Sequence, residues 1–187
     1  GKLYLKTFGG LQILHDEIPI NKSFKSDKIR ALVLVLTSAP SGILREKLMG
    51  LFWPDYPEKS ARQSLRQSLY TIRKVLGQAG IPENCLLTNA DSVQLMLDEN
   101  LWDGDFLKID RAANQIKSHK HQDVRNCPDC MKSLENAMKV YEGDYLSGLV
   151  TDSIEFENWL SHRQSQYKKT ILVWLDYLEY WFASRME

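Results

Sequence analysis

The sequence predicts an α+β amino-terminal domain over residues 1–98 followed by an all-α domain over residues 99–187. Apolar residues first alternate, as in strands, and later recur with helical spacing. The net charge of zero also conceals a division. Residues 1–80 hold 13 Lys and Arg against 6 Asp and Glu, a net charge of +7, and the remaining residues carry −7. A basic part joined to an acidic part indicates two modules with different partners.

Short strands are expected over the first 20 residues. Apolar and polar residues alternate over residues 3–7, Gly9-Gly10 marks a turn, and the alternation resumes over residues 11–13. Ile18-Pro19-Ile20 is expected at a sheet edge, because proline cannot donate a hydrogen bond to a neighbouring strand. An antiparallel amino-terminal sheet is therefore predicted.

Two short helices are predicted next. Residues 28–38 have apolar side chains at helical spacing, and Pro40-Ser41-Gly42 ends that helix. A second helix covers residues 44–51 and stops at Trp53-Pro54, because the residue before proline avoids the α region.

A third helix is predicted from Glu58 to Leu76, with Gly77 as its C′ residue. At 100° per residue, an apolar stripe forms from Ala61, Leu65, Leu69, Ile72 and Leu76. The opposite face, which carries five positive charges and no acid, consists of Lys59, Arg62, Gln63, Arg66, Gln67, Tyr70, Arg73 and Lys74.

This cationic face suits the major groove of double-stranded DNA. Arg and Gln match base edges, and Lys and Arg contact phosphates. The second helix lies just upstream, as a helix-turn-helix requires. The alternative is a solvated charged face, although surface helices usually mix charges of both signs. The sequence therefore predicts DNA binding.

A β-hairpin is predicted after the third helix. Its strands are Leu86–Thr88 and Val93–Leu97, joined by the turn Asn89–Ser92. The hairpin is either a wing that contacts DNA or a hairpin that only packs the domain. The turn holds Asp91 and no Lys or Arg, which predicts a weak contribution to DNA binding.

The acidic second part is predicted to be helical. One helix covers residues 106–118, and a second, marked by Met131, Leu134, Met138 and Tyr141, ends at Gly143. Residues 155–186 form one long helix or two successive ones, with an apolar stripe at Phe156, Trp159, Leu160, Tyr167, Ile171, Leu175 and Leu178. Trp174, Tyr177 and Trp181 fall partly off the stripe, so we expect further helices to pack there and the chain to be a fragment of a longer protein.

Four candidate metal ligands lie between the first two of these helices: His119, His121, Cys127 and Cys130. Zinc takes four N or S ligands in structural sites, and C-x-x-C is a common half-site. The alternatives are exposed histidines, free thiols or a redox dithiol. A catalytic zinc is disfavoured, because four protein ligands would leave no open position.

Several classes of protein are disfavoured by what the sequence lacks. It has none of the nucleotide-binding, zinc-protease or nucleophile-elbow motifs, so we expect no catalytic residues and no enzyme. It has no apolar run long enough to span a membrane and no signal peptide, and its three cysteines are an odd number for a disulfide framework. We expect a soluble protein of the reducing cytoplasm.

The chain resembles the bacterial transcriptional activator domain (BTAD) proteins, including activators of the SARP type. The segments that carry the resemblance are Leu3–Leu14, Ser41–Asp55, Ser60–Gly77, Tyr141–Leu149 and Phe156–Arg163. Their order and spacing together are more specific than any one of them, and they span nearly the whole chain.

The resemblance implies a winged helix-turn-helix of the response-regulator type, followed by a helical activator domain like tetratricopeptide repeats. In such proteins the third helix reads the major groove, which would place Arg62, Arg66, Arg73 and Lys74 on the DNA side. The resemblance also implies that the loop Trp53–Lys59 contacts RNA polymerase. The H-x-H and C-x-x-C segment looks like one found in some large multidomain relatives, which favours a structural zinc.

The sequence departs from the family pattern at two places. The wing turn is acidic rather than basic or glycine-rich, and the helical domain stops early, as if a sensor or ATPase portion were missing. The helical half is expected to contact other domains of a longer chain or a second copy in a homodimer. The alternative to a DNA-binding regulator is a protein interaction module, within a larger signalling protein, whose winged helix does not bind DNA.

Overall fold

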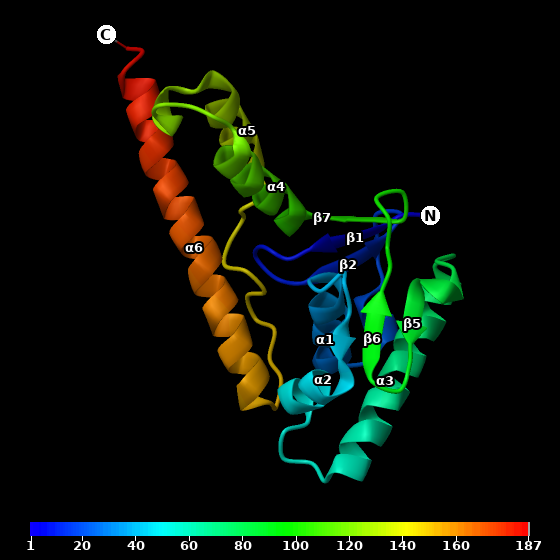
Figure 1. Ribbon diagram of the computed structural model, residues 1–187. Helices are drawn as coiled ribbons and strands as arrows, with labels where there is room; N and C mark the ends of the chain where they lie inside the picture. The colour runs from blue at the N-terminus through cyan, green and yellow to red at the C-terminus, as the bar shows by residue number, and fades with distance from the viewer. Residues whose placement is uncertain (187) are drawn as a thin grey trace. The chain divides into compact units, whose positions relative to one another are not determined.

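The computed structural model describes residues 1–186, which divide into two compact units (Figure 1). Unit 1 consists of Gly1–Leu5, Gln12–Asp103 and Gly148–Leu160. Unit 2 consists of Lys6–Leu11, Gly104–Ser147 and the residues from Ser161 onward. The chain therefore contributes more than one segment to each unit, and each unit is described by itself below.

The amino-terminal strands of unit 1 form a sheet with the order β3-β2-β1-β7. Its strands are β1 (Leu3–Lys6), β2 (Gln12–His15), β3 (Ile18–Pro19) and β7 (Trp102–Gly104). The pairing of β2 with β3 is antiparallel, and β3 lies at the sheet edge, as its proline predicts. The three-residue strand β7 was not predicted, because so short a segment has no readable alternation.

The predicted sequence of three helices and a hairpin is confirmed in unit 1 (Figure 1). The helices are α1 (Asp27–Thr37), α2 (Arg45–Phe52) and α3 (Glu58–Gln78). The hairpin strands β5 (Leu86–Thr88) and β6 (Ser92–Leu95) form a second sheet with β4 (Ile43–Leu44), in the order β4-β6-β5. Unit 1 also contains the single-turn 3-10 helices η1 (Asn21–Phe24) and η2 (Glu83–Cys85).

Helix α1 is the centre of the apolar core of unit 1. The Ser26 hydroxyl caps its first turn by accepting a hydrogen bond from the Ile29 N–H (3.2 Å). All residues from Ala31 to Thr37 are buried. A helix that is apolar on every side belongs inside a core, and α2, α3 and the hairpin can therefore be positioned around it.

The end of α3 differs from the prediction. Gly77 lies inside the helix, which continues to Gln78 and is capped at Ala79. Gly80, with φ of +75°, adopts the left-handed conformation instead. Ala79 is buried, so the packed face of the helix extends beyond Leu76, where the predicted stripe ends. A glycine favours a helix end but does not require one.

Unit 2 is built on helices α4 (Asp105–Ser118), α5 (Pro128–Met138) and α6 (Ile154–Ala183), with the 3-10 turn η3 (Val124–Asn126) between the first two. Helix α5 ends before Tyr141 and Gly143, so the predicted end was wrong. The Tyr141 ring instead lies 5.1 Å from the Phe8 ring, where it joins the apolar core of the unit.

Helix α6 is one continuous helix rather than two. Its residues up to Leu160 belong to unit 1, where Phe156 stacks on Phe52 with ring centroids 5.3 Å apart. The predicted apolar stripe needs one correction, because Trp174 is buried whereas Leu175 is 48% exposed. Trp174 continues the spacing of the buried Tyr167 and Ile171, and a large ring on that face takes the place of leucine.

A buried carboxylate joins the amino-terminal segment of unit 2 to α4. Asp105 is 2% exposed, and its oxygens accept hydrogen bonds from the Thr7 N–H (2.7 Å), the Thr7 hydroxyl (2.6 Å) and the Phe8 N–H (3.0 Å). The Phe106 N–H at the start of α4 donates to the same carboxylate (2.8 Å). This group satisfies four donors that would otherwise be buried without partners.

We expect Asp105→Asn to lower the free energy of unfolding by about 2–3 kcal/mol, because the amide cannot accept all four hydrogen bonds. Denaturant unfolding followed by fluorescence measures the loss. Asp176→Asn, at an exposed position of α6, is the control and should change stability little. Equal stability of the two variants would contradict this role of Asp105.

Candidate nucleic-acid interface

Burial of one stripe of α3 determines which face of the helix reaches solvent. The predicted stripe residues Ala61, Leu65, Leu69, Ile72 and Leu76 are all at most 3% exposed. The predicted cationic face is correspondingly outward. Its exposed members are Lys59, Arg62, Gln63, Arg66, Gln67, Tyr70 and Lys74. Tyr70 is 65% exposed, which is unusual for a large ring and leaves it available to a partner.

Two of the predicted cations already have partners. Arg73 is half-buried and donates to the Leu86 carbonyl on β5 (3.1 Å). Arg62 pairs with Glu58, one turn earlier, at 2.7 Å. The cationic face therefore has an acid, Glu58, at its amino-terminal end. The predicted face began at Lys59 and so did not include this residue. Arg66 and Lys74 are exposed, and no side-chain hydrogen bond or ion pair of theirs is found within residues 1–186.

A hollow of about 660 Å³ lies on one side of α3, bounded by the start of α2 and the hairpin turn. It brings together three guanidinium groups, from Arg45, Arg62 and Arg66. Burial, followed by the charges of Arg66 and Arg62, lowers the pKa of Arg45 below its ordinary value. Glu46 and Asp91 also line the hollow and partly offset this charge.

Arg45 is a site residue that the sequence analysis missed. Its Nε donates to the Asn89 carbonyl (2.7 Å), and its backbone N–H donates to the Asp91 carbonyl (2.8 Å). These bonds hold the start of α2 against the hairpin turn. The two-residue strand β4, just before Arg45, pairs with β6 and was too short to recognise. Without that pairing, nothing in the sequence places Arg45 beside α3.

A second hollow, of about 680 Å³, lies on the other side of α3, against the start of α1. Lys25 and Lys28 line it together with Arg66, Gln67 and Tyr70. Lys28 pairs with Asp152 (2.6 Å) and lies over the rings of Trp53 and Tyr56. Arg66 lines both hollows and is therefore the central cation of this surface.

The hairpin turn is ordered by a local side chain. The Asn89 carboxamide oxygen accepts hydrogen bonds from the Asp91 and Ser92 N–H groups, both at 2.8 Å. This is an Asx turn, which keeps the turn tight without a glycine. Asp91 is exposed, so the acidic character predicted for the turn is on its surface.

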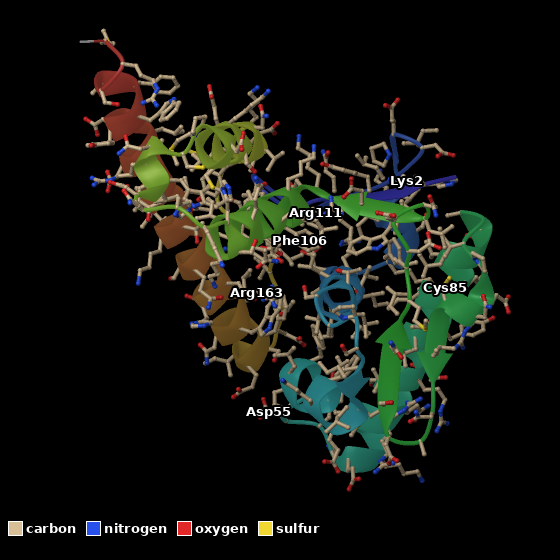
Figure 2. All side chains as sticks on the ribbon, turned by 45° about the horizontal axis from the view of Figure 1, so that its top comes forward. Lys2, Asp55, Cys85, Phe106, Arg111 and Arg163 are labelled. Carbon is tan, nitrogen blue, oxygen red and sulfur yellow. The ribbon has the colours of Figure 1, made fainter. Side chains whose placement is uncertain are left out.

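The segment between α2 and α3 offers fewer free groups than predicted. Trp53 is 5% exposed and packs beside Phe52, so its ring is part of the core. Tyr56 is 46% exposed, and Asp55 (Figure 2) and Lys59 are exposed as well. Any partner of this loop would therefore meet residues 54–59 rather than Trp53.

Three of the four predicted metal ligands meet in unit 2. The ligand atoms of His119, Cys127 and Cys130 all lie within 4.8 Å of one another. His121 is outside this group, and its ring lies 5.6 Å from that of His119. Burial, followed by the neighbouring Cys127, raises the pKa of the Cys130 thiol to about 11. The third cysteine, Cys85, is buried in unit 1 beside the hairpin (Figure 2).

Comparison with known proteins identifies one informative neighbour. No family model matches the chain, and no curated protein matches its sequence. A structure of Mycobacterium tuberculosis EmbR in complex with a low-affinity phosphopeptide is similar, with a TM-score of 0.66 and 20% sequence identity. The match covers 91% of this chain but 42% of EmbR, so the chain spans less than half of that protein.

The likeness to EmbR shows that the chain shares a fold with part of that protein, with mixed α/β structure and small sheets. At this level of identity it bears on the fold alone. Separately, none of the helices within residues 1–186 is both long and apolar enough to cross a membrane.

Arg73 and Lys74 are neighbours with different expected roles. We expect Arg73→Ala to lower the free energy of unfolding by about 1 kcal/mol, because it removes a side-chain hydrogen bond to β5 and the packing of the apolar arginine stem. Lys74→Ala should leave stability within about 0.5 kcal/mol of the wild type. Thermal or denaturant unfolding of the two variants measures the difference, and equal losses would contradict the distinction.

Proposed function

We propose that this chain is a DNA-binding transcriptional regulator of the SARP type, with α3 in the major groove of double-stranded DNA. The observation that carries the proposal is the position of Arg66. It is exposed at the middle of the cationic face and lines the hollows on both sides of the helix. Any duplex that contacts this surface would therefore meet the Arg66 side chain.

The groups that flank α3 are suited to phosphate contacts, and the groups on the helix itself are suited to base contacts. The major groove, about 12 Å wide, admits one helix, and the phosphates on either side then meet whatever flanks it. Gln63, Arg66 and Gln67 are the candidates for base edges, because they are exposed near the middle of the helix and have the bidentate groups that read bases. Arg45 on one side and Lys25 on the other are candidates for phosphates.

The second unit and the α2–α3 loop are proposed to contact protein. Unit 2 holds 12 Lys and Arg against 10 Asp and Glu, so it lacks the large cationic excess that binding to DNA phosphates requires. Tyr56 and its exposed neighbours in the loop are the proposed contact for RNA polymerase. Other domains of a longer chain, or a second copy, are proposed to pack on the helical half.

The second candidate is a protein interaction module that does not bind DNA. The acidic hairpin turn favours it, because Asp91 faces the same hollow as Arg62 and Arg66. EmbR was captured with a phosphopeptide, and an arginine cluster also suits a phosphorylated side chain. The DNA proposal is preferred, because the cations extend along a whole helix face rather than gathering at one point.

The role of α3 is tested with DNA selected by the protein from a random duplex pool. We expect Arg66→Ala to weaken binding to the selected duplex about 10- to 100-fold, because a bidentate base contact contributes about 1–3 kcal/mol. Arg66→Lys should recover only part of the loss, since lysine keeps the charge but not the planar fork. Fluorescence anisotropy across a salt series measures both affinity and its salt dependence.

The salt series supplies the control for non-specific charge effects. With roughly 4–6 phosphate contacts, the log–log slope of affinity against salt should lie near about −4 to −5. Lys168→Ala, on an exposed part of α6, removes a positive charge in unit 2 and should leave affinity and slope unchanged. If Arg66→Ala binds like Lys168→Ala across the series, α3 is not the reading helix.

A substitution in the acidic hairpin turn is expected to strengthen DNA binding rather than weaken it. We expect Asp91→Asn to strengthen binding about 2- to 5-fold at low salt, because it removes a like charge facing the phosphates while the carbonyl that holds Arg45 remains. The gain should shrink as salt rises. Glu83→Gln, an equal charge change at an exposed position of η2, is the control. A gain of the same size in both variants would show a general charge effect.

A further inference from the structure

The His/Cys group of unit 2 lies at the connection between two helices. His119 is the C-cap of α4, Cys127 is the N-cap of α5, and Cys130 lies in the first turn of α5. The segment between them is exposed at Lys120, His121 and Gln122. The start of one helix is therefore brought against the end of another by a loop that contributes little apolar area of its own.

The local backbone explains why the two thiols share a side. Pro128 stands at the first position of α5, where its fixed φ suits a helix start and its missing N–H costs nothing. The Met131 N–H donates to the Cys127 carbonyl at 2.9 Å, which closes the first turn. Residues three apart on a helix turn are neighbours, so Cys127 and Cys130 both face the end of α4.

The distances fit a tetrahedral metal ion. His119 Nδ1 lies 3.2 Å from the Cys130 Sγ and 3.3 Å from the Cys127 Sγ. Zinc bonds of about 2.0–2.1 Å to nitrogen and 2.3 Å to sulfur imply about 3.6 Å between such atoms in a tetrahedron. The group thus needs only a slight expansion to accept the ion. This chemistry also selects zinc over magnesium or calcium, which prefer oxygen ligands.

We propose that His119, Cys127 and Cys130 bind a structural Zn²⁺ ion that closes the α4–α5 connection, with His121 as the fourth ligand. His121 is assigned because its ring already lies beside that of His119 and its exposed side chain can turn toward the thiols. Four protein ligands make the site closed, so it stabilises the helix pair and leaves no position for a substrate.

Arg125 also anchors the loop between α4 and α5, but at its middle rather than at its ends. The Arg125 guanidinium pairs with Asp123 (2.8 Å) and lies 4.1 Å from the centre of the Tyr180 ring on α6. These contacts hold the middle of the loop through partly exposed groups, which contribute little stability. The metal would instead join both ends of the loop. Helices α4 and α5 are in contact, and the register of their buried side chains, Ile109, Ala112, Met131 and Leu134, would then be kept.

Metal content of the wild-type protein, purified under reducing conditions without added zinc, tests the proposal directly. Elemental analysis should find one zinc per chain. Cobalt(II) exchanged for zinc should show the sulfur-to-cobalt charge-transfer band and the intense visible bands of a tetrahedral site. Cys127→Ser and Cys130→Ser should lose the ion, whereas Cys85→Ser, in unit 1, should keep it. His121→Ala should bind cobalt more weakly and with altered visible bands.

A measurement on the wild type avoids reliance on variants that fail to fold. Removing the metal with a chelator should lower the Tm by roughly 10 °C and speed hydrogen exchange at residues 119–130. Zinc well below one per chain with no tetrahedral cobalt spectrum would overturn the site, as would a Cys127–Cys130 disulfide in the reduced preparation. An unchanged spectrum in His121→Ala would overturn the fourth ligand. DNA binding does not enter these readouts, so they stand apart from the proposed function.

Discussion

Burial of one apolar stripe along α3 fixes the orientation of this helix in unit 1. Leu65 and Ile72 are fully buried, and Ala61, Leu69 and Leu76 nearly so, around a core centred on α1. A helix cannot turn about its axis without exposing that stripe, so the opposite face is held outward with Arg66 at its middle. The positions of the start of α2 and of the hairpin turn follow, since both close the hollow beside the same helix.

Packing on this surface brings like charges close together. Burial, followed by the charges of Arg66 and Arg62, depresses the pKa of Arg45, and such an arrangement costs free energy unless anions offset it. Glu58, Glu46 and Asp91 offset it in part. The net charge of zero is thus a sum over regions of opposite sign, and only the basic region carries the cationic helix.

Strong periodicity made the large elements predictable, and short segments were missed. The stripe of α3 and the order of the three helices and the hairpin of unit 1 follow from apolar spacing and turn residues. The strands β4 and β7 are too short to show a period, and pairing across long sequence distances creates them. Arg45 was missed for the same reason. Trp174 is buried and Leu175 is exposed because of the elements that pack on α6. The spacing of apolar residues within one helix does not show those elements.

Backbone amide chemical-shift mapping of the ¹⁵N-labelled protein, titrated with a duplex selected from a random pool, tests directly whether the exposed face of α3 binds DNA. We expect the largest shift changes along the exposed face of α3 around Arg66, with smaller ones at Arg45, Lys25 and the turn Asn89–Ser92. Changes confined to unit 2, or spread evenly over exposed lysines and arginines, would contradict this expectation.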